Sequence, residues 1–125
     1  MNVDYICNMT WFGETIREKR EHLRKEDKRY SLRQVAQRIG VEPAYLSKIE
    51  RGDVAPPSEA TTVKLAKELG EDPDVMLAMA GKVSSDLQEI IRKRPKLFAD
   101  LIRQLKQAPN HAILRIVREV REGDW

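Results

Sequence analysis

The chain has 125 residues, of which 41% are hydrophobic and 34% are charged, so it suits one small domain with an appendage. Its single cysteine excludes an internal disulfide and a cysteine metal cluster, and its two histidines form no H-E-x-x-H motif. No apolar run approaches the ~18 residues of a membrane span and no secretory signal opens the chain. We therefore expect a cytoplasmic protein with no metal, cofactor or membrane contact.

Charge is unevenly distributed along the chain. Residues 16–51 hold 11 Lys/Arg against 6 Asp/Glu, residues 52–81 hold 2 against 6, and residues 82–125 hold 10 against 6. A basic segment with a net charge of +5 is typical of a protein that binds a polyanion, although a solvated helical surface has the same composition.

Helical periodicity begins near Phe12 and continues through Ile16 and Leu23, with Arg20 on the same stripe. The preceding residues lack this periodicity, so residues 1–10 are predicted to form an N-terminal arm. The dense charge that follows predicts the end of the helix or a mobile loop.

A second helix is predicted over residues 31–39. Ser31 is a good N-cap, and the apolar residues then follow the i, i+3, i+4, i+7 pattern of one helical face: Leu32, Val35, Ala36 and Ile39. Gly40 suits the position just after the helix, where the backbone turns left-handed.

A third short helix is predicted over residues 42–51. Pro43 fits its first turn, where a missing N–H costs little. Val41, Leu46 and Ile49 are expected to pack it against the preceding helix, which leaves one face towards solvent. The residues on that free face are Pro43, Ala44, Ser47 and Lys48.

Prolines, glycines and capping residues divide the rest of the chain into further short helices. Two are expected between Ser58 and Gly81, and three more begin near Ser85, Pro95 and a capping Asn110. No alternating, strand-like stretch competes with this pattern. The sequence therefore predicts an all-α fold.

The stretch SLRQVAQRIGVEPAYLSKIERG, residues 31–52, resembles the helix-turn-helix of the phage-repressor and Cro-type regulators, the XRE family. The stretch PPSEATTVKLAKELGEDPDVMLAMAG resembles the fourth and fifth helices of that five-helix domain. The resemblance covers residues 11–81 and implies a repressor-like DNA-binding domain. Residues 82–125 are then expected to form a small C-terminal helical dimerisation or regulatory module.

The resemblance implies that the helix over residues 42–51 enters the major groove of double-stranded DNA. The positions that contact bases in the family correspond to Pro43, Ala44, Ser47 and Lys48. Lys48 can donate to guanine and Ser47 to several bases, whereas Pro43 and Ala44 carry no group for a bidentate contact.

Phosphate contacts are expected from five residues: Ser31, Arg33, Gln34, Tyr45 and Arg51. Tyr45 can equally pack between helices. The resemblance also implies that Arg20 and Glu50 form an ion pair that clamps the recognition helix, the alternative being two unrelated surface charges.

The connection between Arg20 and Ser31 is longer than in compact members of the family. Lys25, Lys28 and Arg29 lie in it and can reach the DNA backbone beside the groove; a solvated helix extension is the equal alternative.

The C-terminal residues carry apolar stripes that must pack on something. Ile113, Ile116, Val117 and Val120 are candidate dimerisation residues, with packing inside one chain as the alternative. Control by a regulatory protein, a peptidase partner or a small ligand remains open.

Two functions are compatible with these features. The first is a sequence-specific transcriptional regulator, a homodimeric repressor. The alternative is an antitoxin that binds a toxin and autoregulates its operon. No enzyme is expected, because His22 and His111 lack a charge-paired triad or metal set and no catalytic residue is predicted.

Overall fold

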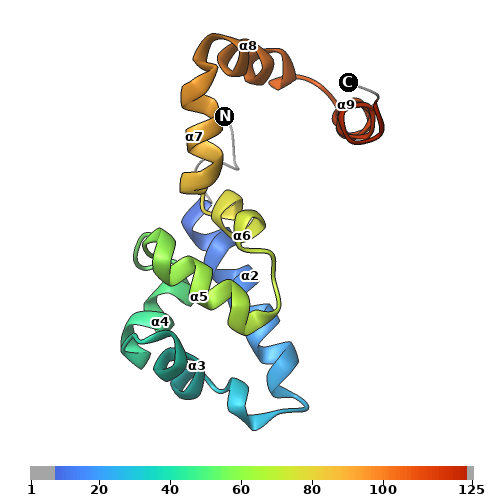
Figure 1. Ribbon diagram of the computed structural model, residues 1–125. Helices are drawn as coiled ribbons and strands as arrows, with labels where there is room; N and C mark the ends of the chain where they lie inside the picture. Colours follow the sequence, from blue (N-terminus) through green and yellow to red (C-terminus); the bar gives the residue numbers. More distant parts are fainter. Residues whose placement is uncertain (1–7, 124–125) are drawn as a thin grey trace. The chain divides into compact units, whose positions relative to one another are not determined.

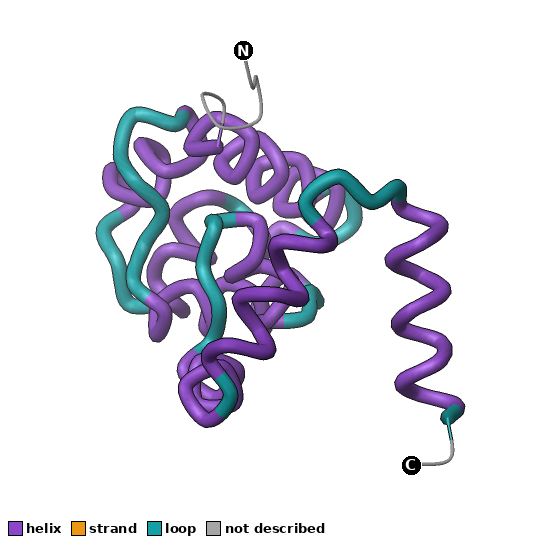
Figure 2. The backbone as a smooth tube through the Cα atoms, turned by 90° about the horizontal axis from the view of Figure 1, so that it is seen from above, coloured by secondary structure: helices purple, strands orange, loops and turns teal. Residues whose placement is uncertain are grey.

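The computed structural model describes the backbone of residues 8–123, with side chains from Trp11 onwards. Every regular element in this range is a helix, and the tube in Figure 2 contains only helix and loop there, which confirms the predicted all-α fold class. The elements are α2 (Asn8–Arg24), the 3-10 helix η1 (Lys28–Tyr30), α3 (Leu32–Ile39), α4 (Pro43–Arg51), α5 (Glu59–Leu69), α6 (Pro73–Met79), α7 (Ser85–Lys93), α8 (Pro95–Leu105) and α9 (Asn110–Glu122).

The chain divides into two compact units, an N-terminal unit that ends at Ser84 and a C-terminal unit that begins at Ser85. The N-terminal unit contains α2 to α6 with η1, and the C-terminal unit contains α7 to α9 (Figure 1). The division falls after the boundary expected at residue 81. Lys82 belongs to the N-terminal unit, and its Nζ donates to the carbonyl oxygen of Pro57 at 3.1 Å.

The first described helix, α2, begins at Asn8, before the start expected near Phe12. The last residues of the predicted arm are therefore helical, and residues 1–7 lie outside the described residues. At its other end α2 stops at Arg24, and Asp27 caps η1 by accepting from the backbone N–H of Arg29 at 2.9 Å. The charged connection is thus a tight turn followed by a capped 3-10 helix.

The core of the N-terminal unit takes one face from each of its α-helices. These faces are buried because they carry the apolar residues at helical spacing, and their burial supplies the main driving force for folding. The buried core residues are Phe12, Ile16, Val35, Ala36, Ile39, Leu46, Ile49, Leu65, Ala66, Leu69, Met76 and Ala80.

Helix α2 crosses α4 closely at Gly13. A Cβ built at this glycine would lie 2.7 Å from the carbonyl oxygen of Glu50, a contact that side chains do not tolerate. The backbone of α2 therefore touches the C-terminal end of α4 directly. This contact helps to fix the direction in which α4 leaves the core.

The C-terminal unit has no buried residue in the part that the structure describes. Its helices are amphipathic, and their large exposed apolar side chains are Leu87, Ile90, Leu97, Leu101, Ile102, Leu114, Ile116, Val117 and Val120. The last helix starts at Asn110 itself, with Pro109 in the cap position and no side-chain cap bond. The expectation that Asn110 caps this helix is therefore wrong, because Pro109 already supplies the extended backbone that precedes the first turn.

Candidate nucleic-acid interface

The turn between α3 and α4 is short and closed by backbone hydrogen bonds. Gly40 adopts the left-handed conformation with φ of 79°, which costs a glycine nothing. The N–H of Val41 donates to the carbonyl oxygen of Ala36 at 2.9 Å, and the Val41 side chain packs on the core. The sequence folds this way locally because Gly40 ends α3 and Pro43 opens α4 with the φ that a first turn needs.

Helix α4 buries one face and leaves the other open. Leu46 and Ile49 are 0% and 1% exposed. Ala44 and Lys48 are exposed, while Pro43 at the start of the helix is half-buried. The small and basic side chains therefore lie outside the core, on the side from which another molecule can approach.

Ser47, the fourth of these residues, is also half-buried. It lines a hollow of about 290 Å³ in the surface of the N-terminal unit, which we call the α2–α4 hollow. The residues that line it are Arg17, Arg20, Glu21, Arg24, Leu32, Ser47, Glu50 and Arg51.

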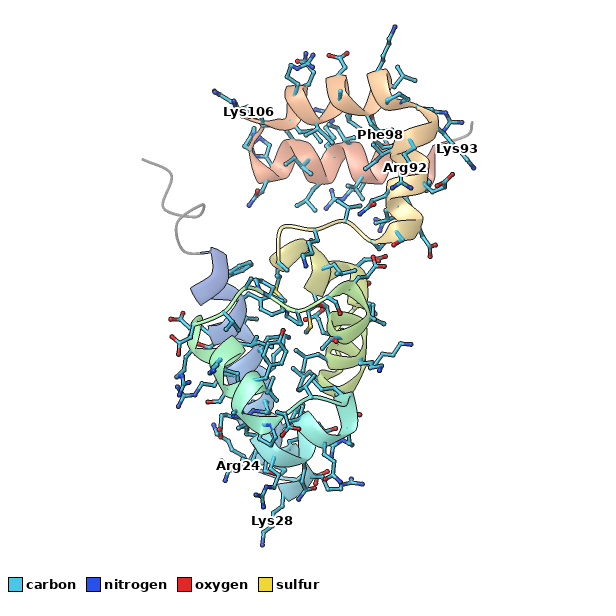
Figure 3. The ribbon with its side chains drawn as sticks, turned by 90° about the vertical axis from the view of Figure 1, so that its left-hand side faces the viewer. Arg24, Lys28, Arg92, Lys93, Phe98 and Lys106 are labelled. Carbon is cyan, nitrogen blue, oxygen red and sulfur yellow. The ribbon has the colours of Figure 1, made fainter. Side chains whose placement is uncertain are left out.

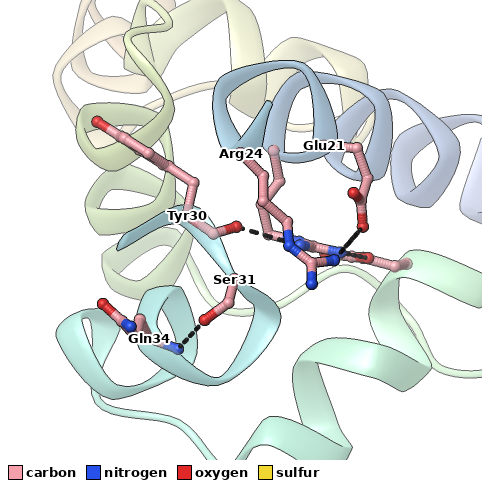
Figure 4. Close-up of polar contacts among 7 residues, drawn as sticks. Glu21, Arg24, Tyr30, Ser31 and Gln34 are labelled. Carbon is pink, nitrogen blue, oxygen red and sulfur yellow. Dashed lines mark hydrogen bonds and ion pairs between the residues drawn. The ribbon is translucent and has the colours of Figure 1, made fainter. Parts of the chain in front are cut away.

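Arg20 and Glu50 form a buried, two-point ion pair beneath this hollow. Arg20 Nε donates to Glu50 Oε2 at 2.7 Å, and Nη2 donates to Oε1 at 3.0 Å. The same guanidinium donates to the carbonyl oxygen of Tyr30 at 3.2 Å and to Glu21 Oε1 at 3.0 Å (Figure 4). The pKa of Arg20 is raised above its ordinary value, mainly by the hydrogen bond to Glu50. This charged guanidinium joins α2, η1 and α4 at one point.

Three of the expected phosphate-contacting residues lie at the start of α3. The Ser31 Oγ accepts from the backbone N–H of Gln34 at 3.3 Å, so it caps the helix (Figure 4). Arg33 and the Gln34 side chain are exposed. A capped helix start with a nearby arginine is a favourable environment for an anion.

The other two expected phosphate-contacting residues lie on α4. Arg51 is exposed, with its Nε 3.0 Å from Asp53 Oδ2. The ring of Tyr45 is half-buried and packs against the core. Tyr45 thus packs between helices, which is one of the two roles expected for it.

Two arginines of α2 that line the hollow, Arg17 and Arg24, were not predicted as site residues from the sequence. With Arg20 they follow the spacing i, i+3, i+7, which places all three on one side of a helix. That spacing was a usable signal. It was hidden because Arg24 stands within a run of charged residues that predicted a helix end or loop.

The four candidate dimerisation residues share one side of α9. Ile113 is half-buried, and Ile116, Val117 and Val120 are exposed. Three of the four are therefore exposed to solvent in the described part of a single chain.

Among the described residues, the helices lack the combination of length and hydropathy that a membrane span requires. Among the same residues no cluster of three or more His, Cys, Asp and Glu side chains is arranged to hold a metal ion. The α2–α4 hollow contains arginines, glutamates, a serine and a leucine, a set suited to holding an anion rather than a metal.

Residues 16–76 match the model of a protein family described as helix-turn-helix. The match spans α2 from Ile16 to Met76 in α6, and so includes the turn at Gly40 and all of α4. Neither the curated proteins nor the solved structures gave a match to the chain.

Proposed function

We propose that this DNA-binding transcriptional regulator is a sequence-specific, homodimeric repressor. Its residues 16–76 belong to the helix-turn-helix family, which consists of DNA-binding regulatory domains and not of enzymes. Its α4 enters the major groove, and Ser47 and Lys48 contact base edges there. Pro43 and Ala44 allow close approach and apolar contact with thymine methyl groups.

The observation that carries this proposal is the division of α4 into two faces. Leu46, Ile49 and Glu50 are buried, whereas Ala44 and Lys48 are exposed. A helix held in this way keeps a free side that can lie in a groove about 12 Å wide. The Arg20–Glu50 pair clamps the end of the helix, so that the free side keeps a fixed direction.

Phosphate contacts position the unit on the duplex. In this proposal the DNA backbone is contacted by Ser31, Arg33 and Gln34 at the start of α3 and by Arg51 at the end of α4. These contacts carry no sequence information, but they make affinity fall steeply with salt.

The C-terminal unit supports a dimer. A helical unit with no buried residue in its described range does not bury enough apolar surface to be stable alone, so its apolar faces need a partner. In the proposed homodimer, α9 of each chain contributes Ile113, Ile116, Val117 and Val120. Two linked recognition helices then bind two half-sites, and repression follows from occlusion of the promoter.

The test is a selection of bound sequences from a random duplex library with the full chain. We expect a short motif that recurs as two half-sites, with centres about 34 Å or a multiple of that distance apart. Recovery of duplexes with no shared motif would contradict sequence-specific binding. A single, unrepeated motif would contradict the dimer.

The exposed apolar faces of α7 to α9 also fit a second candidate function, that of an antitoxin. In that case the C-terminal unit covers a toxin, and the N-terminal unit autoregulates the operon. The two functions differ in what the native chain is bound to. The mass of the native complex, isolated from the cells that make it, separates a homodimer from a complex with a second protein.

A further inference from the structure

We propose that the α2–α4 hollow seats one phosphate of the DNA backbone, and that Arg17 and Arg24 are its additional ligands. The inference rests on the proposed function, because it assumes that a duplex approaches α4. It adds two residues on α2, outside the helix-turn-helix itself, to the DNA-binding surface.

The arginines of α2 are close to the recognition helix. Arg17, Arg24 and Ser47 line the same hollow, so two arginines of α2 lie beside a residue of the recognition helix. The Arg24 side chain is 54% exposed, and in Figure 3 it lies at the end of α2 next to Lys28. When α4 lies in the major groove, the sugar-phosphate rim of the groove runs along the flank of the helix. The hollow, which Ser47 of α4 shares with the arginines of α2, would then lie beside that rim.

The charged side chains that line the hollow favour an anion. The hollow is lined by four arginines and two glutamates, of which Arg20 and Glu50 neutralise one another in the buried ion pair. The remaining charges in the lining are three arginines, Arg17, Arg24 and Arg51, against Glu21. Arg51 also pairs with Asp53, which does not line the hollow, so Arg17 and Arg24 carry most of the excess. This excess attracts an anion, and the planar guanidinium fork matches the oxygens of a phosphate.

In the free protein, Arg24 is held only weakly by Glu21. Arg24 Nη1 lies 3.5 Å from Glu21 Oε1, a long and exposed ion pair that contributes little stability. A phosphate with better geometry can therefore take Arg24 from Glu21. Glu21 keeps its contact with Arg20 Nη2 at 3.0 Å, so its carboxylate stays close to the incoming phosphate. Glu21 is thus expected to weaken DNA binding.

The test measures dissociation constants of the full chain for its selected operator and for a random duplex, over a range of salt concentrations. Arg17→Ala and Arg24→Ala are each expected to weaken binding about three- to tenfold on both duplexes. Each is also expected to reduce the slope of log K against log salt by no more than about 0.9, the contribution of the one phosphate that they share. Glu21→Gln, which keeps an oxygen for Arg20, is expected to bind DNA about two- to fivefold more tightly because a like charge beside the phosphate is removed.

Lys64→Ala is the matched control, because Lys64 is an exposed cation on α5 that does not line the hollow. It removes the same charge and is expected to change affinity less than twofold and leave the slope unaltered. Arg24→Lys keeps the positive charge but not the guanidinium fork. It is therefore expected to show the salt dependence of the wild-type chain with a lower affinity. This variant separates loss of a phosphate contact from loss of folding.

Two results overturn the inference. One is that Arg17→Ala and Arg24→Ala bind like Lys64→Ala while the wild-type chain binds its operator; the hollow is then no phosphate site, and the proposed function stands. The other is that Glu21→Gln weakens binding on both duplexes. If the wild-type chain binds no duplex at all, the proposed function fails and this inference fails with it.

Discussion

Arg20 of α2 and Glu50 of α4 are joined at two points, Nε to Oε2 at 2.7 Å and Nη2 to Oε1 at 3.0 Å, although they are 30 residues apart in the chain. Both side chains are buried, with residue exposures of 3% and 5%. The pair links α2 to the C-terminal end of α4.

Removing one partner of this pair leaves the other as a buried, unpaired charge. Glu50→Ala is therefore expected to lower the free energy of unfolding by about 3–5 kcal/mol. Circular dichroism during urea denaturation measures this change. A loss below about 1 kcal/mol, typical of an exposed pair, would show that the pair is not buried in solution.

The double variant Arg20→Met with Glu50→Leu separates stability from orientation. Apolar residues of similar volume often replace a buried pair with little loss of stability. We expect this variant to fold but to bind its operator more weakly, because the clamp on α4 and the bond to the Tyr30 carbonyl oxygen are lost. Operator affinity equal to that of the wild type would contradict the clamping role.

Gly13→Ala tests the close crossing of α2 and α4, and the sign of the effect is informative. Helix propensity alone predicts that alanine in place of a helical glycine stabilises the fold by about 0.5–1 kcal/mol. The added Cβ would instead lie 2.7 Å from the Glu50 carbonyl oxygen, so the backbones must separate. We expect a destabilisation of about 1–3 kcal/mol, measured by urea denaturation. A stabilised variant would contradict the crossing.

Lys48→Ala tests base recognition by the exposed face of α4. Loss of a base contact is expected to weaken operator binding by about 1–3 kcal/mol and to leave binding to a random duplex nearly unchanged. Arg33→Ala is the matched comparison, because loss of a phosphate contact weakens both duplexes alike and flattens the salt dependence. Fluorescence anisotropy titrations of both duplexes measure these effects. Equal losses on both duplexes for Lys48→Ala would place its contact on the backbone.

The helix-turn-helix could be predicted from the sequence because its determinants are local. Gly40, Pro43 and the apolar spacing of Leu46 and Ile49 lie within ten residues of one another, and each acts on the nearest turn of helix. The family match over residues 16–76 confirms this resemblance. The all-α class followed from the same local signals, repeated along the chain.

The one contact between distant parts of the chain that was expected, the Arg20–Glu50 pair, came from the family resemblance and not from a local pattern. Other features of this kind were not predicted. Gly13 gave no local signal, because its role comes from the approach of α2 to the carbonyl oxygens at the end of α4. The α2–α4 hollow was missed for the same reason, since Arg17 and Arg24 acquire a shared site with Ser47 only after α2 has packed on α4. The capped η1 is instead a local feature, formed by contacts between the Asp27 carboxylate and Arg29. It was not predicted because it stands within a run of charged residues whose composition alone does not reveal it.

Val117→Asp tests the dimer contact proposed for α9. Val117 is 49% exposed in the described chain, so an aspartate there should be tolerated by the folded monomer. In a dimer it would be buried without a partner, which is strongly unfavourable. We expect a shift to monomers in sedimentation velocity and a steep loss of operator affinity, because two half-sites are no longer bound together.

His111→Asp, on the opposite side of α9, introduces the same charge and should remain dimeric. If Val117→Asp also sediments as a dimer, the interface lies elsewhere, and α7 and α8 become the surfaces to test, since they also expose large apolar side chains.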